Sequence, residues 1–317
     1  MSERPAATPR IVLEPALEAH DRTLYLATVV AEGVAGFGAV DAAQLAAYRR
    51  RGFLVIRGAY SDSDVVAARD ELDALTRSEL PQCEYIHYEG SIAEHLSVDH
   101  AENGRRASEW NDRIIGQTFD RIPDVPAEPR ALCVRKVTGF VGAHRALNTM
   151  AYKTELLSVL ERVVGEPVRL HQDMALVKPP GGREKPWHQD HAYFNLPLET
   201  PIVGVWIALH PVNPENGCMV VLPGGHLEGP RPHFMRRDYQ ICDDDIHQTT
   251  HQQRVALRMR AGDALLFDGK LPHGTPTNRT QDRRWAVQYH YVGENAQTDD
   301  EIDHREAFGS EGKDVTC

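Results

Sequence analysis

The stretch that decides the fold is WHQD (residues 187–190), together with its distant complement DGKLPHG (residues 268–274). Alternate residues of an extended strand point to the same face, so His188 and Asp190 project together and the residue between them points away. His273 can supply a second imidazole from another strand. Two imidazoles and one carboxylate on one face of an octahedral metal leave the opposite face open, as in non-haem Fe(II) oxygenases. These three residues are therefore candidate iron ligands.

A His-x-Asp tripeptide alone is weak evidence, because the chain has 16 histidines and the pattern also fits an ordinary surface strand. A second strand pattern, RWAVQYHY (residues 284–291), follows downstream. Its two faces differ in character. The face expected to pack against a core carries Trp285, Val287, Tyr289 and Tyr291. The face expected to line a polar barrel lumen carries Arg284, Ala286, Gln288 and His290.

Arg284 adds a requirement of its own. An arginine that points into a barrel keeps its charge, and an unpaired buried charge costs several kcal/mol. It therefore needs an anionic partner, ideally a carboxylate held by both arms of the guanidinium. That partner could be a structural Asp or Glu, or the distal carboxylate of a bound 2-oxo acid.

Further motifs accompany these two strands in a fixed order. They are KPPG (178–181), WIAL (206–209), NGCM (216–219), PGGH (223–226), GD (262–263), HGT (273–275), Asn278 and Arg284. With these motifs the stretch from about residue 170 to 291 resembles the phytanoyl-CoA dioxygenase family of Fe(II)/2-oxoglutarate-dependent oxygenases.

The resemblance implies a set of site residues. It implies His188, Asp190 and His273 as iron ligands and Arg284 as the anchor of 2-oxoglutarate. Further contacts with the co-substrate are expected from Thr275, Gln172 and Trp206. Serine is common in the family where this chain has Thr275, but the hydroxyl is kept. PGGH is a structural turn in the family, so His226 is not expected to be a fourth ligand.

The resemblance also implies the reaction. Fe(II), 2-oxoglutarate and O2 would oxidise an unactivated C–H bond of a small molecule, with release of succinate and CO2. Hydroxylation is the expected outcome, although desaturation, epoxidation or ring formation need only a different substrate pose. No catalytic residue beyond the metal ligands is expected, because the protein provides positioning and exclusion of water. The substrate is open, and a natural-product intermediate is the guess.

Composition limits the class of protein. The chain has 317 residues and a net charge of −11, with a pI near 5.8. No basic stripe exists to meet phosphates, which argues against a nucleic-acid partner. Apolar runs are too short for a membrane span, and no signal core is visible. Five cysteines without a Cys-x-x-Cys pair predict reduced thiols in a cytoplasmic protein. Oligomeric state is open.

The order of elements predicts an α+β fold in one domain, 1–317. Helices are expected at 41–52, from 61 onward and at 150–164, because capping signals and apolar periodicity coincide there. Strands are expected at 53–56, 130–137, 168–177, 201–209, 219–222, 255–259, 264–267 and 284–291. These strands would form a double-stranded β-helix, a jelly-roll or cupin-like barrel, backed by the N-terminal helices.

Three regions are harder to interpret. Residues 1–10 are expected to form a flexible tail, and 81–130 are either a surface excursion or a wall of the substrate pocket. Candidate substrate contacts are Tyr85, His87, Tyr88 and Tyr193. Residues 227–252 lack regular periodicity and are expected to form a lid over the iron site. In 201–209, Gly204 and Ala208 flank Trp206, either to leave room for a ligand or in ordinary large-small packing.

Two other functions compete with the oxygenase. A cupin-like isomerase or hydrolase could use the same ligands with a different metal, but that chemistry needs no 2-oxo acid and leaves Arg284 unexplained. A binding or sensor protein could keep the barrel without turnover. Succinate release in the presence of a substrate would distinguish the oxygenase from both.

Overall fold

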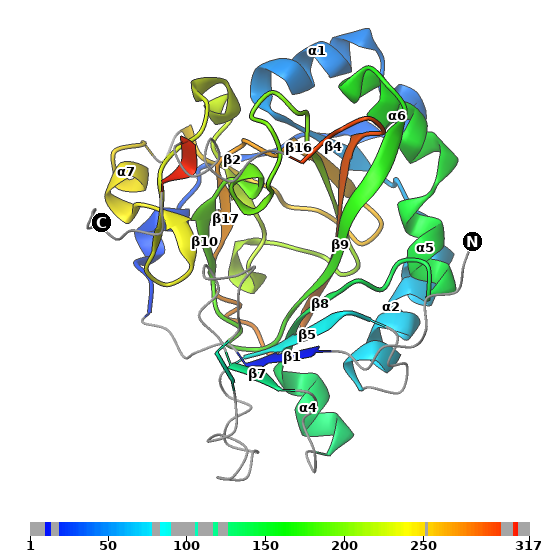
Figure 1. The fold of residues 1–317 in the computed structure, drawn as a ribbon, viewed down its shortest axis with the longest axis vertical. Helices are drawn as coiled ribbons and strands as arrows, with labels where there is room; N and C mark the ends of the chain where they lie inside the picture. Colours follow the sequence, from blue (N-terminus) through cyan, green and yellow to red (C-terminus); the bar gives the residue numbers. More distant parts are fainter. Residues whose placement is uncertain are drawn as a thin grey trace.

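The computed structural model describes residues 10–13, 19–77, 83–89, 105–106, 117–119, 126–250, 253–298 and 307–309. Two sheets face each other, and helices cover the outer face of the larger sheet (Figure 1). This is the double-stranded β-helix that the sequence predicted, and the prediction of an α+β jelly roll is confirmed. Of the expected tail 1–10, only Arg10 lies within the described residues, as the first residue of β1.

The larger sheet has eleven strands among the described residues. Their spatial order is β3 (Val34–Ala35), β4 (Phe53–Arg57), β16 (Ala264–Asp268), β11 (Val203–Ala208), β18 (Arg284–Gly293), β9 (Val168–Lys178), β8 (Val134–Thr138), β5 (Tyr85–Tyr88), β1 (Arg10–Leu13), β7 (Gln117–Phe119) and β6 (Arg105–Arg106). The smaller sheet has the order β10 (Lys185–His188), β17 (His273–Thr275), β12 (Val220–Val221), β15 (Val255–Ala256) and β2 (Val29–Val30). A separate hairpin pairs β13 (His233–Met235) with β14 (Tyr239–Ile241).

Strand β18 lies in the middle of the larger sheet, between β9 and β11. Its two faces separate as the alternation predicted. Trp285, Val287, Tyr289 and Tyr291 belong to the hydrophobic core between this sheet and the helices. The opposite face looks toward the smaller sheet, where Arg284, Gln288 and His290 line a cavity. The barrel lumen therefore carries the polar residues of this strand.

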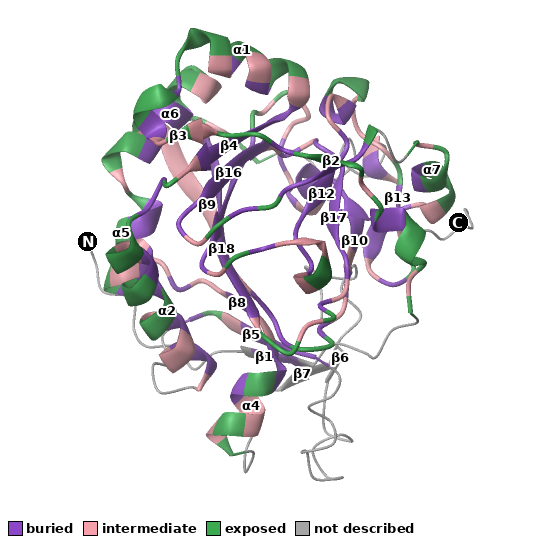
Figure 2. Ribbon diagram, turned by 180° about the vertical axis from the view of Figure 1, so that it is seen from behind, coloured by how far each residue is buried: buried purple, intermediate pink, exposed green. Residues whose placement is uncertain are grey.

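Helices α1 (Ala42–Arg51), α2 (Asp62–Thr76), α5 (Arg145–Ala151) and α6 (Thr154–Val164) form the outer layer. Figure 2 shows buried strands at the centre and exposed outer faces on these helices. The predicted start signals of α1 and α2 are confirmed, because the Asp41 carboxylate accepts from Gln44 N and Ser61 forms a capping box with Asp64. Gly52, with φ of 81°, ends α1.

Two element boundaries were predicted wrongly. The helix expected at 150–164 is two helices, because Tyr152 leaves the helical conformation (φ −108°, ψ 27°) and α6 begins anew after Lys153. The break coincides with the polar residues 153–155, which interrupt the apolar repeat. The strand expected from residue 130 begins at Val134, since α4 (Ala127–Cys133) occupies the preceding residues. Pro129 lies in the first turn of α4, where a missing N–H costs nothing, so it did not break the helix.

The thiols also differ from expectation in one case. Cys83 and Cys218 are free thiols, as predicted, and both are buried. Cys242 is disulfide-bonded, so the prediction of five reduced thiols is wrong there. The spacing of cysteines in a sequence cannot reveal a pairing that only the fold creates. Within the described part of the chain, no helix has the length and apolar composition needed to cross a membrane.

The small residues beside Trp206 have a packing explanation. A Cβ placed on Gly204 would lie 2.3 Å from the ring of Phe267, which pairs with it across β11 and β16. Ala208 belongs to the hydrophobic cluster between the two sheets. Of the two alternatives for these residues, the structure therefore favours large-small packing over space for a ligand.

Candidate metal centre and co-substrate pocket

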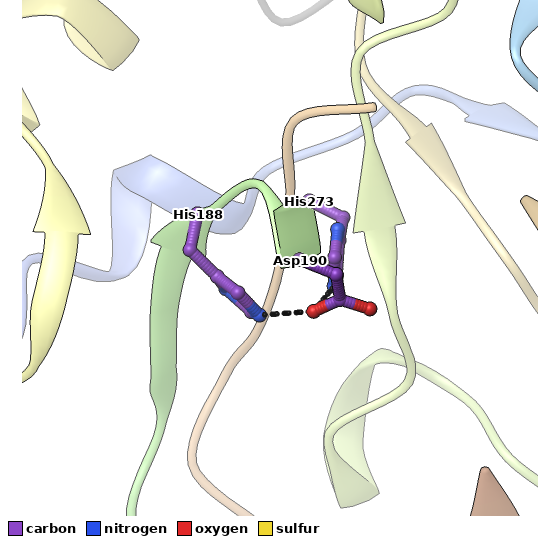
Figure 3. Close-up of side chains that lie close together, drawn as sticks. All are labelled: His188, Asp190 and His273. Atoms are coloured by element: carbon purple, nitrogen blue, oxygen red, sulfur yellow. Dashed lines mark ion pairs between the residues drawn. The ribbon is translucent and has the colours of Figure 1, made fainter. Parts of the chain in front are cut away.

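Neighbouring strands of the smaller sheet bring the three predicted iron ligands together. His188 ends β10, His273 begins β17, and the two are directly paired in the antiparallel register. Asp190 begins the short 3-10 helix η4 (Asp190–Tyr193), immediately after the extended residue Gln189. Figure 3 shows both imidazoles directed at the Asp190 carboxylate. Its Oδ1 lies 3.2 Å from His188 Nε2 and 3.6 Å from His273 Nε2.

The two imidazoles are held in the tautomer that a metal requires. His188 Nδ1 is 2.7 Å from the carbonyl of Pro186, and His273 Nδ1 is 2.9 Å from the carbonyl of Leu271. A carbonyl only accepts, so each Nδ1 carries a hydrogen, and the neutral form of either ring would present the lone pair of Nε2 to a metal. Burial lowers the pKa of His273 to about 4, which keeps this ring neutral. These buried donor atoms all lie within 4.8 Å of one another, close enough to hold one ion.

Asp190 is oriented by two residues of β18. Its Oδ2, the oxygen turned away from the ligand histidines, lies 2.7 Å from His290 Nε2 and 3.0 Å from Gln288 Nε2. Burial raises the pKa of Asp190, but the neighbouring His273 and His290 outweigh this effect and hold the pKa well below its usual range. The carboxylate is therefore charged, with one oxygen engaged and the other directed at the ligand cluster. Such support of a ligating group strengthens metal binding.

Gln189 points away from the cluster, as the alternation predicted, and it is fully buried. Its amide nitrogen donates to the carbonyls of Gly229 and Lys270, and its amide oxygen accepts from Arg231 N. The WHQD segment thereby fixes both the candidate ligands on one side and two loops on the other.

Arg284 lies in the same cavity as the candidate ligands. Only 2% of it is exposed, and its guanidinium lies over the ring of Trp206, 5.3 Å from the centroid. Among the described residues, Arg284 Nε and Nη1 have no hydrogen-bond partner. Burial lowers the pKa of Arg284 to about 10, so it stays charged near pH 7. The sequence left two possible partners for Arg284, a structural Asp or Glu and a bound carboxylate. No Asp or Glu among the described residues pairs with it. A bound carboxylate fits it.

The other expected co-substrate contacts line this cavity as well. They are Thr275, Gln172 and Trp206. Trp206 Nε1 is buried without a partner among the described residues, and the Thr275 hydroxyl accepts from Lys178 Nζ at 2.8 Å. One end of the cavity thus carries unpaired hydrogen-bond donors beside a buried positive charge. This composition suits an anion rather than an apolar ligand.

Comparison with known proteins decides the family. Residues 48–286 match the phytanoyl-CoA dioxygenase (PhyH) family. The chain belongs to this family. Human peroxisomal phytanoyl-CoA dioxygenase is 26% identical over 259 residues, which are 77% of this chain and 66% of that enzyme. The match therefore spans slightly less than two thirds of the length of that relative.

Two solved structures share the fold of this PhyH-family chain. EctD from S. alaskensis, crystallised with 2-oxoglutarate and 5-hydroxyectoine, has a TM-score of 0.57 at 20% identity and covers 82% of this chain and 78% of its own. The 2-oxoglutarate-dependent carbocyclase SnoK from nogalamycin biosynthesis has a TM-score of 0.56 at 21% identity, with coverages of 84% and 90%. At these identities the likeness establishes the fold alone.

The expected substrate contacts of this PhyH-family chain divide into two groups. Tyr193 lines the cavity, with its ring edge-on to His188 at 5.6 Å. Its hydroxyl donates to the carbonyl of Tyr239 and accepts from Lys185 Nζ, so it is already engaged. Tyr85, His87 and Tyr88 form strand β5, which pairs with β1 and β8 in the larger sheet, and none of them is among the lining residues of the cavity. The structure does not bring these three to the candidate site.

The segment expected to be a lid is folded in this structure. Within 227–250 it contains β13, β14 and helix α7 (Asp243–His247), while residues 251–252 lie outside the described part. Two adjacent ion pairs join it to the strand that ends in His188. Arg237 pairs with Glu184, and Asp238 pairs with Lys185 at 2.7 Å. The pair 184–185 carries a negative charge and then a positive one, and the pair 237–238 carries the reverse. The two segments can therefore form both ion pairs in only one register. Lys185 and Asp238 both line the cavity.

Reasoning from the sequence missed three residues of this site: Lys178, Gln288 and His290 as partners of Thr275 and Asp190. Gln288 and His290 were placed correctly on the lumen face, but no partner was foreseen. Lys178 was only quoted as part of KPPG. His226, which was set aside as a ligand, lies against the carbonyl of Arg49 and is not part of the ligand cluster.

Proposed function

We propose that this PhyH-family protein is an Fe(II)- and 2-oxoglutarate-dependent oxygenase that acts as one domain on a small molecule. His188, Asp190 and His273 would hold the iron. Arg284 would hold the distal carboxylate of 2-oxoglutarate, supported by Thr275. The observation that carries the proposal is the buried guanidinium of Arg284, which has no partner among the described residues and lines the same cavity as a His-Asp-His cluster.

The donor set fits the metal. Two imidazoles and one carboxylate suit Fe(II) and leave positions open for a chelating co-substrate and O2. When bound, the iron couples decarboxylation of 2-oxoglutarate to succinate and CO2 with oxidation of the substrate by O2. Among halogenating relatives of such enzymes the carboxylate position is free for a halide. Intact Asp190 therefore favours oxygenation, and hydroxylation of an unactivated C–H bond is the proposed outcome.

The contribution of this chain is orientation and exclusion of water. The carbonyls of Pro186 and Leu271 fix the histidine tautomers, and His290 and Gln288 fix the carboxylate. Burial of all three candidate ligands keeps bulk water away from them. No described side chain is assigned as a general acid or base, because positioning and electrostatics are sufficient for this class of reaction.

The substrate is proposed only as a small molecule, with a natural-product intermediate as the first class to screen. The competing isomerase or hydrolase would leave Arg284 as a buried unpaired charge without use, and the binding protein would not need an oriented carboxylate. A cytoplasmic location stays a prediction. No partner macromolecule is proposed.

Substrate-dependent formation of succinate, with matching O2 uptake, tests the proposal. Purified protein would be reconstituted with Fe(II) and 2-oxoglutarate and screened against candidate compounds, with Asp190→Ala as the matched control. Binding gives a second readout that needs no substrate, because the iron chelate of 2-oxoglutarate absorbs visible light under anaerobic conditions. If the protein bound Fe(II) but never 2-oxoglutarate, the isomerase or hydrolase would take its place.

A further inference from the structure

Lys178 is a buried lysine that lines the same cavity as Arg284 and Thr275. It ends strand β9, is 7% exposed, and is paired in register with Arg284 on β18. Its Nζ lies 2.8 Å from Thr275 Oγ1, 2.6 Å from the carbonyl of Pro276 and 3.3 Å from the carbonyl of Thr275. An ammonium has three hydrogens and no lone pair, so these three oxygens match its donors in number.

The fold makes room for this lysine at one glycine. A Cβ on Gly217 would lie 2.6 Å from the carbonyl of Pro276 and 3.0 Å from Lys178 Cδ. Gly217 also has φ of 82°, which disfavours any other residue. Three separate motifs of the sequence, KPPG, NGCM and HGT, therefore meet at the Lys178 side chain.

Without a bound ligand, the surroundings of Lys178 destabilise the charged form of its side chain. Burial, and after it the charge of Arg284, lowers the pKa of Lys178 well below its usual range. A carboxylate held by Arg284 would counteract the second effect. Lys178 itself has no donor left to give that carboxylate, because all three are directed at residues 275 and 276.

The contact with Thr275 determines what the hydroxyl can do. A hydroxyl has one hydrogen to donate and lone pairs to accept with. Lys178 donates to Thr275 Oγ1, and the Thr275 hydrogen has no acceptor among the described residues. Thr275 and Arg284 line the same cavity. The hydroxyl hydrogen is therefore available to an anion that Arg284 holds.

We propose that Lys178 is a positioning residue for co-substrate binding, which acts through Thr275 by fixing its hydroxyl as a donor to the carboxylate held by Arg284. This inference rests on the proposed function. It predicts that Lys178 and Thr275 contribute to affinity as one unit and not as two independent groups.

A double-mutant cycle tests this coupling. Lys178→Met keeps the length of the side chain without its donors, and Thr275→Val keeps the shape of its side chain without the hydroxyl. The dissociation constant of 2-oxoglutarate would be measured anaerobically from the absorbance of the Fe(II) chelate. Loss of one hydrogen bond to a charged group predicts that each single variant binds roughly ten- to a hundred-fold more weakly. The double variant should be within about two-fold of the weaker single variant, because both remove the same contact.

Three further variants sharpen the cycle. Thr275→Ser keeps the hydroxyl and should retain the affinity, but should lose it when combined with Lys178→Met. Lys270→Met is the matched control, because Lys270 donates to the carbonyl of Leu198 and lies outside this cavity. Its co-substrate affinity should be unchanged. If Lys178→Met does not fold, Lys178→Leu, which also lacks donors, takes its place in the cycle and should show the same non-additivity.

Two results would overturn the inference. Multiplicative effects in the double variant would make Lys178 an independent cation. An unchanged affinity in the Lys178 variant that folds, Lys178→Met or Lys178→Leu, would leave it no role in binding. Both results require that the unaltered protein binds 2-oxoglutarate. If the unaltered protein bound Fe(II) without any chelate absorbance, the proposed function itself would fail, which is a separate outcome.

Discussion

Replacement of Arg284 is the perturbation that discriminates most sharply between the candidate functions. The structure buries this guanidinium with Nε and Nη1 unpaired among the described residues. A carboxylate held by two charge-assisted hydrogen bonds gains roughly 1.5–3 kcal/mol from each. Loss of both in Arg284→Met therefore predicts co-substrate binding weaker by roughly a hundred- to ten-thousand-fold. Arg284→Lys keeps a charge but loses the fork, so its loss should be smaller.

For the stability of the ligand-free protein, the same substitution should have the opposite effect: it should stabilise the fold. An unpaired buried charge destabilises the fold, and methionine of similar length removes it. Arg284→Met should therefore raise the melting temperature without ligand and abolish the increase that 2-oxoglutarate gives to the unaltered protein. If Arg284 instead formed a structural ion pair, Arg284→Met should lower the melting temperature, because it would leave the partner as an unpaired buried charge.

The pH dependence follows from the lowered pKa of Arg284, about 10. Binding requires the charged form, which is fully present below this pKa and is lost as pH rises through it. The contribution of Arg284 to the affinity for 2-oxoglutarate should therefore be flat between pH 7 and 9, and should fall above about pH 10. Bound carboxylate favours the charged form, so saturating co-substrate should move the fall to higher pH.

Anaerobic titration of 2-oxoglutarate into the Fe(II) form, followed by chelate absorbance, measures these effects together with thermal unfolding. Arg283→Ala is the matched control. Arg283 contacts Asp73 at 3.9 Å on the helix side of the sheet and does not line the cavity. If Arg283→Ala lost the co-substrate and Arg284→Met kept it, the orientation of β18 would be wrong. If neither substitution changed the affinity for 2-oxoglutarate, Arg284 would not be its anchor. A metal-dependent isomerase or hydrolase would then be the better-supported function.

Three other predictions concern the metal and the folded segment beside it. His188→Ala, His273→Ala and Asp190→Ala should each abolish substrate-dependent succinate formation, and efficient chlorination by the unaltered protein would contradict the role given to Asp190. His290→Ala should weaken Fe(II) binding roughly ten- to a hundred-fold in a chelator competition, because Asp190 Oδ2 loses a donor, whereas His290→Gln should keep part of the affinity. An effect as large from His226→Gln, on a histidine remote from the ligands, would attribute the loss to general destabilisation. Residues 227–250 should gain protection from hydrogen exchange when co-substrate and substrate bind, and Arg237→Met, which removes the partner of Glu184, should raise their exchange without ligand. Equal strong protection with and without ligand would make the segment a fixed wall of the cavity.

The sequence predicted well those features that depend on the alternation of neighbouring residues along a strand. Alternation alone separated the two faces of β18, and it placed His188 and Asp190 on one side of the chain although Asp190 lies just beyond the end of β10. The extended conformation of Gln189 (φ −115°, ψ 128°) continues the strand geometry by one residue, which is why the period of two still held.

The failures occurred where a local signal had two physical causes. Apolar residues on both sides of Tyr152 fitted one helix, yet the chain breaks there to join α5 to α6. Gly204 fitted both a ligand space and close packing, and only the position of Phe267 on the neighbouring strand distinguishes them. Tyr85, His87 and Tyr88 do not line the cavity themselves, although His87 pairs with Lys136, which does, so their role as substrate contacts stays a prediction.

The partners of the site residues were beyond any local pattern. His290 was expected in the lumen, but its bond to Asp190 joins positions 100 residues apart. That bond depends on the position of β18 in one sheet facing the end of β10 in the other. Lys178 reaches Thr275 across a similar separation, and the approach is possible only because Gly217, from a third segment, has no side chain. The pairing of His188 with Asp190 follows from spacing within a strand, whereas the groups that orient Asp190 follow from how the two sheets face each other. Variants of His290 and Lys178 therefore test the fold as much as the chemistry.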